Sequence, residues 1–269
     1  MVIVITLQEL SLNFLCRTKI GSVILKKLVK SNFSILVGKF LDSKYSKILL
    51  LFKNVDLTKF EKNNVLDYAS YNDFFIRKSI IPEKIFKENG IFAPASGYLS
   101  IFYSDTDFMV KNIKYSIYDL LQDHELACEF QDSYVAIIRI TTAQEHRYTY
   151  AATGNLLSNT FIDGILNSVH PIAAEKNPVY ATNKRNFSLI ETKHMGKIIQ
   201  MEVGALCVGK IINYQNDGLV LGGTEKGYFA YGGSSIVLIV KKENVNLSCD
   251  KVYEKFVNKG FKIFEEECK

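Results

Sequence analysis

Hydrophobic and polar positions follow different patterns in the two parts of this chain. Between residues 19 and 53, apolar residues such as Ile20, Ile24 and Leu28 recur at helical spacing, with lysines between them. From residue 91 onward, short runs of β-branched and aromatic residues alternate with Gly, Asn and Asp, which is typical of strands joined by turns. The pattern predicts amphipathic helices at the N-terminus, followed by a β-rich body.

The β-rich body is expected to resemble a sandwich or barrel, because it contains many short strands. The strands are predicted over residues 98–103, 134–141, 187–192, 197–203, 207–214 and 235–240. One helix is expected within the body, over residues 117–130, and a further helix is predicted in the tail, over residues 252–267. The fold class is therefore α+β and mainly β, with a helical segment over residues 1–60 and a β-rich domain over residues 61–269.

The positive charge is concentrated in the helical part. Residues 1–53 hold nine basic and two acidic residues, a net charge of +7, whereas the whole chain carries +5. Basic amphipathic helices can lie on an anionic membrane surface, although a surface helix that packs on a core shows the same pattern. No apolar run reaches the roughly 18 residues of a spanning helix. We expect a cytoplasmic protein, peripheral on the membrane, with no nucleic-acid partner.

One short motif suggests chemistry. Gly232 and Gly233 precede Ser234, and a run of β-branched residues follows. Gly233 can adopt strained backbone angles, and its carbonyl is open to attack by the Ser234 hydroxyl. Such an attack would convert the peptide bond to an ester, and elimination and hydrolysis would leave a pyruvoyl group at a new N-terminus. The motif alone is weak evidence, because Gly-Gly-Ser usually forms a turn.

The surroundings of this motif resemble the phosphatidylserine decarboxylase family. Matches to the family's motifs follow in the same order along residues 68–240, at residues 71–77, 93–97, 111–121, 146–148, 183–185, 203–209 and 225–235. The first 60 residues match in character only. The resemblance implies a pyruvoyl-dependent decarboxylase made as a proenzyme. It would cut itself between Gly233 and Ser234, giving fragments 1–233 and 234–269.

The resemblance also implies a processing triad of Asp, His and Ser, in which the histidine takes the proton of the serine. In this chain Ser96 stands at the position of the aspartate and Thr149 at that of the histidine, so only Ser234 of the triad is present. Serine and threonine hydroxyls titrate far above neutral pH and are poor bases. A strain-driven cut, or another base such as His146 or His170, is an alternative to the missing pair.

Other roles are carried over from the family in the same way. His146 is implied as a proton donor in decarboxylation, because an imidazole near its ordinary pKa of roughly 6.5 can protonate a carbanion. Phe74 and Phe75 are candidate contacts to substrate or membrane. The expected cofactor is the pyruvoyl group made from Ser234, with no PLP and no metal.

Three functions stay open at this point. The first is decarboxylation of phosphatidylserine to phosphatidylethanolamine and CO2. The second is the same chemistry on a free or peptide-linked amino acid. The third is an unprocessed homologue that binds lipid or a partner without catalysis. Partners are accordingly a phospholipid or amino-acid substrate and an anionic membrane surface, and a homodimer is a further possibility.

Overall fold

A computed structural model of the chain describes residues 18, 21, 33–52, 55–80, 85–86, 89–141, 143–169, 174–175, 177–205, 210–215, 217–230, 234–249 and 252–267. Gly233 and His170, both singled out from the sequence, lie outside these residues, as does most of the helix expected after residue 19. Among the helices that are described, none is both long and apolar enough to cross a membrane.

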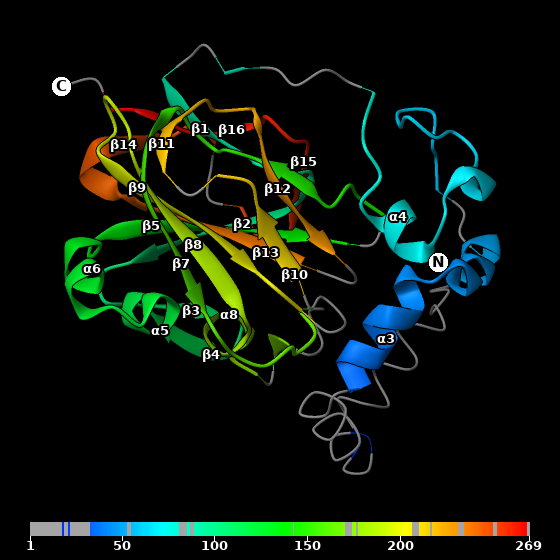
Figure 1. The fold of residues 1–269 in the computed structure, drawn as a ribbon. Coiled ribbons are helices and arrows are strands. Elements are labelled where there is room, and N and C mark those ends of the chain that lie inside the picture. The colour runs from blue at the N-terminus through cyan, green and yellow to red at the C-terminus, as the bar shows by residue number, and fades with distance from the viewer. Residues whose placement is uncertain are drawn as a thin grey trace, which may run out of the picture.

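The body is built on one large antiparallel sheet (Figure 1). Within the described residues it has eight strands, and it is open, because it ends at β11 on one side and at β15 on the other. In spatial order the strands are β11 (Gly218–Val220), β7 (Gly154–Ile162), β8 (Arg185–Glu191), β9 (Lys197–Val203), β13 (Ser234–Lys241), β5 (Ser133–Ile140), β2 (Gly97–Ser104) and β15 (Lys255–Val257).

Strand β13 lies near the middle of this sheet and is buried on both faces. Its alternate residues enter two separate cores, with Ile236 and Leu238 on one face and Val237 and Ile239 on the other. A continuous apolar run is what a strand buried on both faces requires.

Different elements cover the two faces of the sheet. The face of Ile236 packs against two three-stranded sheets, formed by β1 (Gly90–Phe92), β16 (Lys262–Glu266) and β14 (Val245–Leu247), and by β10 (Lys210–Asn213), β12 (Glu225–Ala230) and β6 (Arg147–Thr149). The face of Val237 packs against the hairpin β3 (Asp107–Val110) and β4 (Ile113–Ser116), and against helices α5 (Ile117–Leu121), α6 (His124–Glu129) and α8 (Val179–Thr182). A short 3-10 helix, η3 (Lys242–Asn244), follows β13.

The N-terminal helices pack at one end of the molecule, away from α5 and α6 (Figure 1). They are α3 (Phe33–Asp42), the 3-10 helices η1 (Lys44–Phe52) and η2 (Val65–Asp67), and α4 (Tyr71–Phe75). A small core of Leu50, Leu57, Tyr68 and Phe74 joins η1 to α4. Helix α4 begins after Ser70, whose side chain accepts a hydrogen bond from the backbone N–H of Asp73.

The α+β, mainly β fold class is confirmed, and strands lie at all six predicted runs, the run at 207–214 being described only from residue 210. The helix predicted over 117–130 is instead two short helices, because Gln122 adopts a left-handed conformation and Asp123 caps α6. The predicted tail helix is wrong. Residues 255–257 pair with β2 and residues 262–266 pair with β1 and β14, so sheet pairing decides the tail's structure.

Candidate functional site

Ser234 is the first residue of β13 and lies opposite Ile140 of β5. It is completely buried, and its Oγ has no hydrogen-bond partner among the described residues. A buried hydroxyl without a partner costs stability, commonly about 1–3 kcal/mol. Several other buried polar atoms share this state, so it is the place of Ser234 directly after Gly233 that favours a chemical role over a structural one.

The structure brings Ser96 and Thr149 together at the turn that precedes β2. The backbone N–H and the Oγ1 of Thr149 both donate to the carbonyl of Pro94, at 2.9 and 3.2 Å. The Oγ of Ser96 accepts a hydrogen bond from the backbone N–H of Lys259 at 2.9 Å. Both side chains are thus engaged by the backbone.

This turn and Ser234 lie at the same end of the main sheet, where β2 and β13 begin. Tyr98 of β2 and Ser235 of β13 both pair with Arg139 of β5, the strand between them. Strands β2 and β13 therefore begin at the same end of the sheet, on either side of β5, and two strand spacings separate them by about 10 Å. The three positions expected to form a triad thus gather in one region, with Ser234 carrying the hydroxyl that has no described partner.

His146 is also completely buried. Its ring stacks on Phe75, with 3.6 Å between the ring centroids. Its Nδ1 lies 3.1 Å from the carbonyl oxygen of Gln144, whereas its Nε2 has no partner in the part of the chain that is described. Because a carbonyl oxygen can only accept, Nδ1 carries the proton and Nε2 keeps its lone pair.

The environment of His146 favours the neutral ring. Burial, and after it the positive charge of Arg77, hold the pKa of His146 well below its ordinary value of 6.5. The expectation that His146 titrates near 6.5 is therefore wrong for this chain, because its surroundings are dry and adjacent to a cation. At neutral pH the ring begins as a proton acceptor, and it can donate from Nε2 only after it has taken up a proton.

Phe74 and Phe75 are not surface residues, since they are 1% and 0% exposed. A membrane contact for either residue is wrong, because both rings are enclosed by the protein. Phe74 belongs to the small core that joins η1 to α4. Phe75 covers the imidazole of His146, so a contact with substrate through that ring stays a prediction for Phe75 alone.

A buried ion pair lies on the Ser234 face of the sheet and was not predicted. The Nζ of Lys226 lies 2.5 Å from the Oε2 of Glu202, and both side chains are 0% exposed. Glu202 stands opposite Ile236 of β13. Gln200 donates both to the Oε1 of Glu202 and to the carbonyl of Thr149, each at 3.0 Å. Gln200 and Glu202 alternate with apolar residues in β9, and this was the sequence signal for a polar patch on that face.

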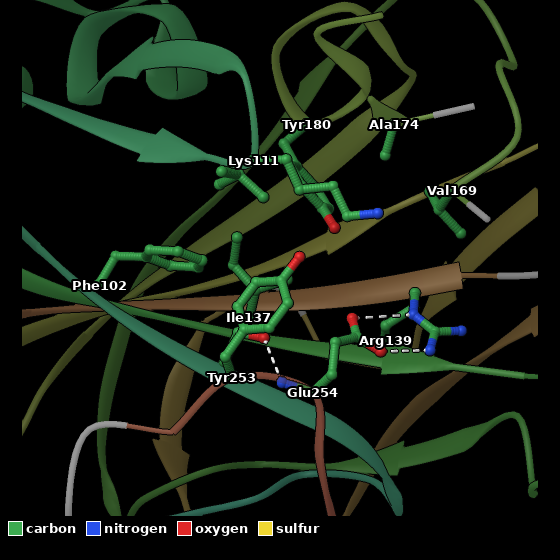
Figure 2. Close-up of a pocket in the computed structure, with 11 residues that line it drawn as sticks. Phe102, Lys111, Ile137, Arg139, Val169, Ala174, Tyr180, Tyr253 and Glu254 are labelled. Carbon is green, nitrogen blue, oxygen red and sulfur yellow. Dashed lines mark hydrogen bonds and ion pairs between the residues drawn. The ribbon is translucent and has the colours of Figure 1, made fainter. Parts of the chain in front are cut away.

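A small pocket lies on the other face of the sheet, beside Ile137 and Arg139 of β5 (Figure 2). In Figure 2, Lys111 and Tyr180 enter from one side, while Arg139 and Glu254 form a two-point ion pair on the other. Lys111 is paired with Glu175 at 2.8 Å, so the charges around the pocket balance. Its free volume of about 20 Å³ has room for about one water molecule. In this conformation the pocket does not admit a lipid headgroup.

A sequence model described as phosphatidylserine decarboxylase matches residues 71–264, which is most of the chain and includes Ser96, His146, Thr149 and Ser234. The chain belongs to the phosphatidylserine decarboxylase family. The relatives include the phosphatidylserine decarboxylase proenzyme 2 of Clostridium acetobutylicum, 35% identical over 89% of this chain and 84% of the relative. The proenzyme of Clostridium novyi is 35% identical over 96% and 89%, and that of Chlamydia muridarum is 34% identical over 90% and 84%.

Membership of the phosphatidylserine decarboxylase family raises the question of whether Ser234 fits as the source of a pyruvoyl group. It does, on two observations. Its hydroxyl is buried and has no described partner, and it begins a strand that follows directly on Gly233 in the sequence. The departures from the family's pattern at Ser96 and Thr149 leave His146 as the described imidazole closest in sequence to the expected base position.

Proposed function

We propose that this chain is the proenzyme of a pyruvoyl-dependent decarboxylase that converts phosphatidylserine to phosphatidylethanolamine and CO2. Membership of the family and the names of its relatives support the class of reaction. The observation that carries the proposal is the buried Ser234 hydroxyl, which has no partner among the described residues and lies at the start of a central strand.

Self-cleavage would begin at Ser234. Its Oγ attacks the carbonyl carbon of Gly233, while the hydroxyl proton passes to the Nε2 of His146. The bond from Gly233 to the nitrogen of Ser234 breaks, and the same proton moves from Nε2 to that nitrogen. An ester now joins the two residues. Loss of the Cα proton of Ser234 expels the ester oxygen as the carboxylate of Gly233, and hydrolysis with release of ammonia leaves the pyruvoyl group.

His146 is the proposed base because it and Ser234 share two features. Each is 0% exposed, and each has one polar atom that no described group binds. Both belong to the same side of the main sheet, since Ser234 lies two residues before Ile236 in β13 and the ring of His146 stacks on Phe75 of the core that contains Ile236. The assignment requires the Nε2 of His146 to approach the Ser234 hydroxyl.

In decarboxylation, the pyruvoyl group supplies the sink for the electrons released as CO2 leaves. His146 would hold a proton on Nε2 and deliver it to the substrate carbon. Phe75 covers one face of the imidazole and keeps water from it, which favours transfer to substrate over exchange with solvent.

A peripheral membrane location is part of the proposal, and the surface of α3 and η1 supports it. Apolar side chains there are strongly exposed, at 62% for Leu36, 59% for Ile48 and 65% for Leu51. Lys39, Lys44 and Lys47 lie in the same two helices. Exposed apolar residues flanked by lysines are suited to the interface of an anionic membrane, where they would bring the protein to a lipid substrate.

The non-catalytic alternative has one observation in its favour. The hydroxyls of Ser96 and Thr149 are bound by backbone groups, which is a stable arrangement that needs no chemistry. This alternative predicts a protein that folds and binds lipid but is never cut.

Intact-mass measurement of the purified protein separates these functions. We expect fragments 1–233 and 234–269 from the wild type, and a single chain of 30.5 kDa from Ser234→Ala. Ser235→Ala is the matched control and should still be cut, because Ser235 faces the other side of the sheet. A wild-type chain that stays whole on long incubation would refute the enzymatic proposal. Cut protein that releases CO2 from free amino acids but not from phosphatidylserine would favour the soluble substrate.

A further inference from the structure

Arg77 is a buried arginine that binds backbone carbonyls. It lies just after α4 and is 2% exposed. Its Nη1 donates to the carbonyl of Phe74 at 3.1 Å, and its Nη2 donates to the carbonyls of Ala143 and Gln144 at 2.6 and 2.9 Å. Within the described part of the chain it forms no ion pair with a carboxylate. Its guanidinium also lies 4.7 Å from the centre of the Phe60 ring.

One of these carbonyls joins Arg77 to His146. The oxygen of Gln144 lies 2.9 Å from the Nη2 of Arg77 and 3.1 Å from the Nδ1 of His146. A carbonyl oxygen has two lone pairs, so it can accept from both groups at once. Phe75, two residues before Arg77, stacks on the imidazole. The short segment from Phe75 to Arg77 therefore fixes both the plane of the ring and its Nδ1 edge.

We propose that Arg77 is a positioning residue for His146, which it orients by holding the Gln144 carbonyl that binds the Nδ1–H. This inference rests on the proposed function, in which the Nε2 of His146 acts as the base for Ser234. The chemical consequence is a single tautomer. With its proton committed to Gln144, the ring must present its lone pair at Nε2, the atom that would receive a proton.

The charge of Arg77 acts in the same direction. After burial, it is the second cause that lowers the pKa of His146. The other charged groups of the same region come in pairs, Glu145 with Lys259 at 3.1 Å and Arg147 with Glu225 at 2.6 Å. Arg77 is the charged group that acts on His146, and Glu145 acts in turn on Arg77 from within its pair with Lys259. Arg77 therefore keeps the imidazole neutral and ready to accept.

A second arginine offers a matched control. Arg185 is 0% exposed and donates to the carbonyls of Leu120, Asn183 and Asp119 at 2.7 to 3.0 Å, so it makes the same kind of bond set as Arg77. It lies against α5 on the opposite face of the sheet. Replacing it should cost comparable stability without touching His146.

The test uses the uncut Ser234→Ala chain with ¹⁵N-labelled histidine, read by NMR. His146 is assigned among the four histidines by comparison with His146→Gln. We expect the Nδ1–H tautomer and no protonation at pH 6. Arg77→Met should raise the proton affinity of the ring about tenfold or more and mix its tautomers. Arg77→Lys keeps the charge but loses the planar guanidinium that binds several carbonyls at once, so it should mainly mix the tautomers. Arg185→Met should do neither.

Two results would overturn the proposal. One is an unchanged tautomer and proton affinity in folded Arg77→Met and Arg77→Lys. The other is an equal change in Arg185→Met, which would make the effect a general loss of stability. Because the measurement needs no cleavage, it separates Arg77 from the proposed function. If NMR shows the shift while the wild type is never cut, the role of Arg77 stands and the enzymatic proposal falls.

Discussion

Breaking the buried pair of Lys226 and Glu202 should be costly from either side. In Lys226→Met, the Glu202 carboxylate keeps only Gln200 at 3.0 Å and Asn213 at 3.3 Å as donors. In Glu202→Leu, the described hydrogen-bond acceptor that Lys226 keeps is the Asn213 oxygen at 3.1 Å, beside the rings of Tyr148 and Tyr150. Removing one partner of a fully buried pair costs about 3–5 kcal/mol. Because Glu202 keeps two hydrogen-bond donors and Lys226 keeps one acceptor, we expect Lys226→Met to cost about 3 kcal/mol and Glu202→Leu about 5 kcal/mol.

The double variant should recover most of this loss. With both charges gone, Gln200 still donates to the carbonyl of Thr149, and Asn213 still donates to Asn186 at 2.9 Å. Replacing a whole buried pair by apolar residues is often neutral. We therefore expect the double variant to lie within about 2 kcal/mol of the parent, which corresponds to a coupling energy of about 6 kcal/mol or more.

The stability of the Glu202→Leu variant should also depend on pH, through the titration of Lys226. Burial lowers the pKa of Lys226, and Glu202 opposes that effect, so Glu202→Leu lowers it further. The unfolded chain then binds more protons than the folded one. The loss of unfolding free energy therefore becomes smaller as pH rises toward 10.5, the pKa of Lys226 in the unfolded chain.

Urea unfolding followed by circular dichroism measures these free energies, in the Ser234→Ala background so that every chain is whole. Lys114→Met is the control, because Lys114 is 68% exposed in its pair with Asp107. It should cost less than about 1 kcal/mol. Single variants that both cost under about 1 kcal/mol, or a stability loss in Glu202→Leu that grows as pH rises, would refute the reasoning.

Two further predictions concern processing and the membrane. Ser96→Asp together with Thr149→His should speed cleavage at Ser234, because the two positions lie at one turn and act as a unit, while either change alone should do little. Intact-mass measurements over time follow the cleavage rate. A double variant that is cut as slowly as the wild type would mean that a different base operates. Replacing Leu36, Ile48 and Leu51 by Ser should weaken sedimentation with anionic vesicles and leave folding intact, since all three residues are exposed. The control is Phe161→Ser with Leu219→Ser, on β7 and β11, where the side chains are 59% and 71% exposed. This control should sediment with the vesicles as the wild type does. Equal loss in both sets would place the lipid contact elsewhere.

The sequence predicts the central strands well, because continuous apolar runs such as that of β13 indicate strands that are buried on both faces. It fails in the tail, where the spacing of Val252, Phe256 and Val257 fits a helix. There, pairing of Phe256 with Tyr98 at the edge of the sheet decides the outcome. Such pairing joins residues far apart in the chain and leaves no local pattern.

The candidate site divides in the same way. Ser234, His146, Ser96 and Thr149 could be located from motifs, since each occupies a fixed place in an ordered set. The state of His146 could not, because its low pKa comes from burial and from Arg77, 69 positions away. The ion pair of Lys226 and Glu202 could not be predicted from the sequence either, because it joins strands of two different sheets.

The place of Ser234 at the head of β13 has a consequence for the protein after a cut. The released segment would hold β13, β14, β15 and β16, and β13 is hydrogen-bonded to β9 on one side and β5 on the other. The two products would thus be interleaved within one sheet rather than set side by side. Cutting would turn a single chain into a heterodimer whose interface is the core itself. Folding of the intact chain is unimolecular, whereas refolding of the cut protein from denaturant would require two separate fragments to associate. Cleavage would therefore make unfolding of the mature protein effectively irreversible.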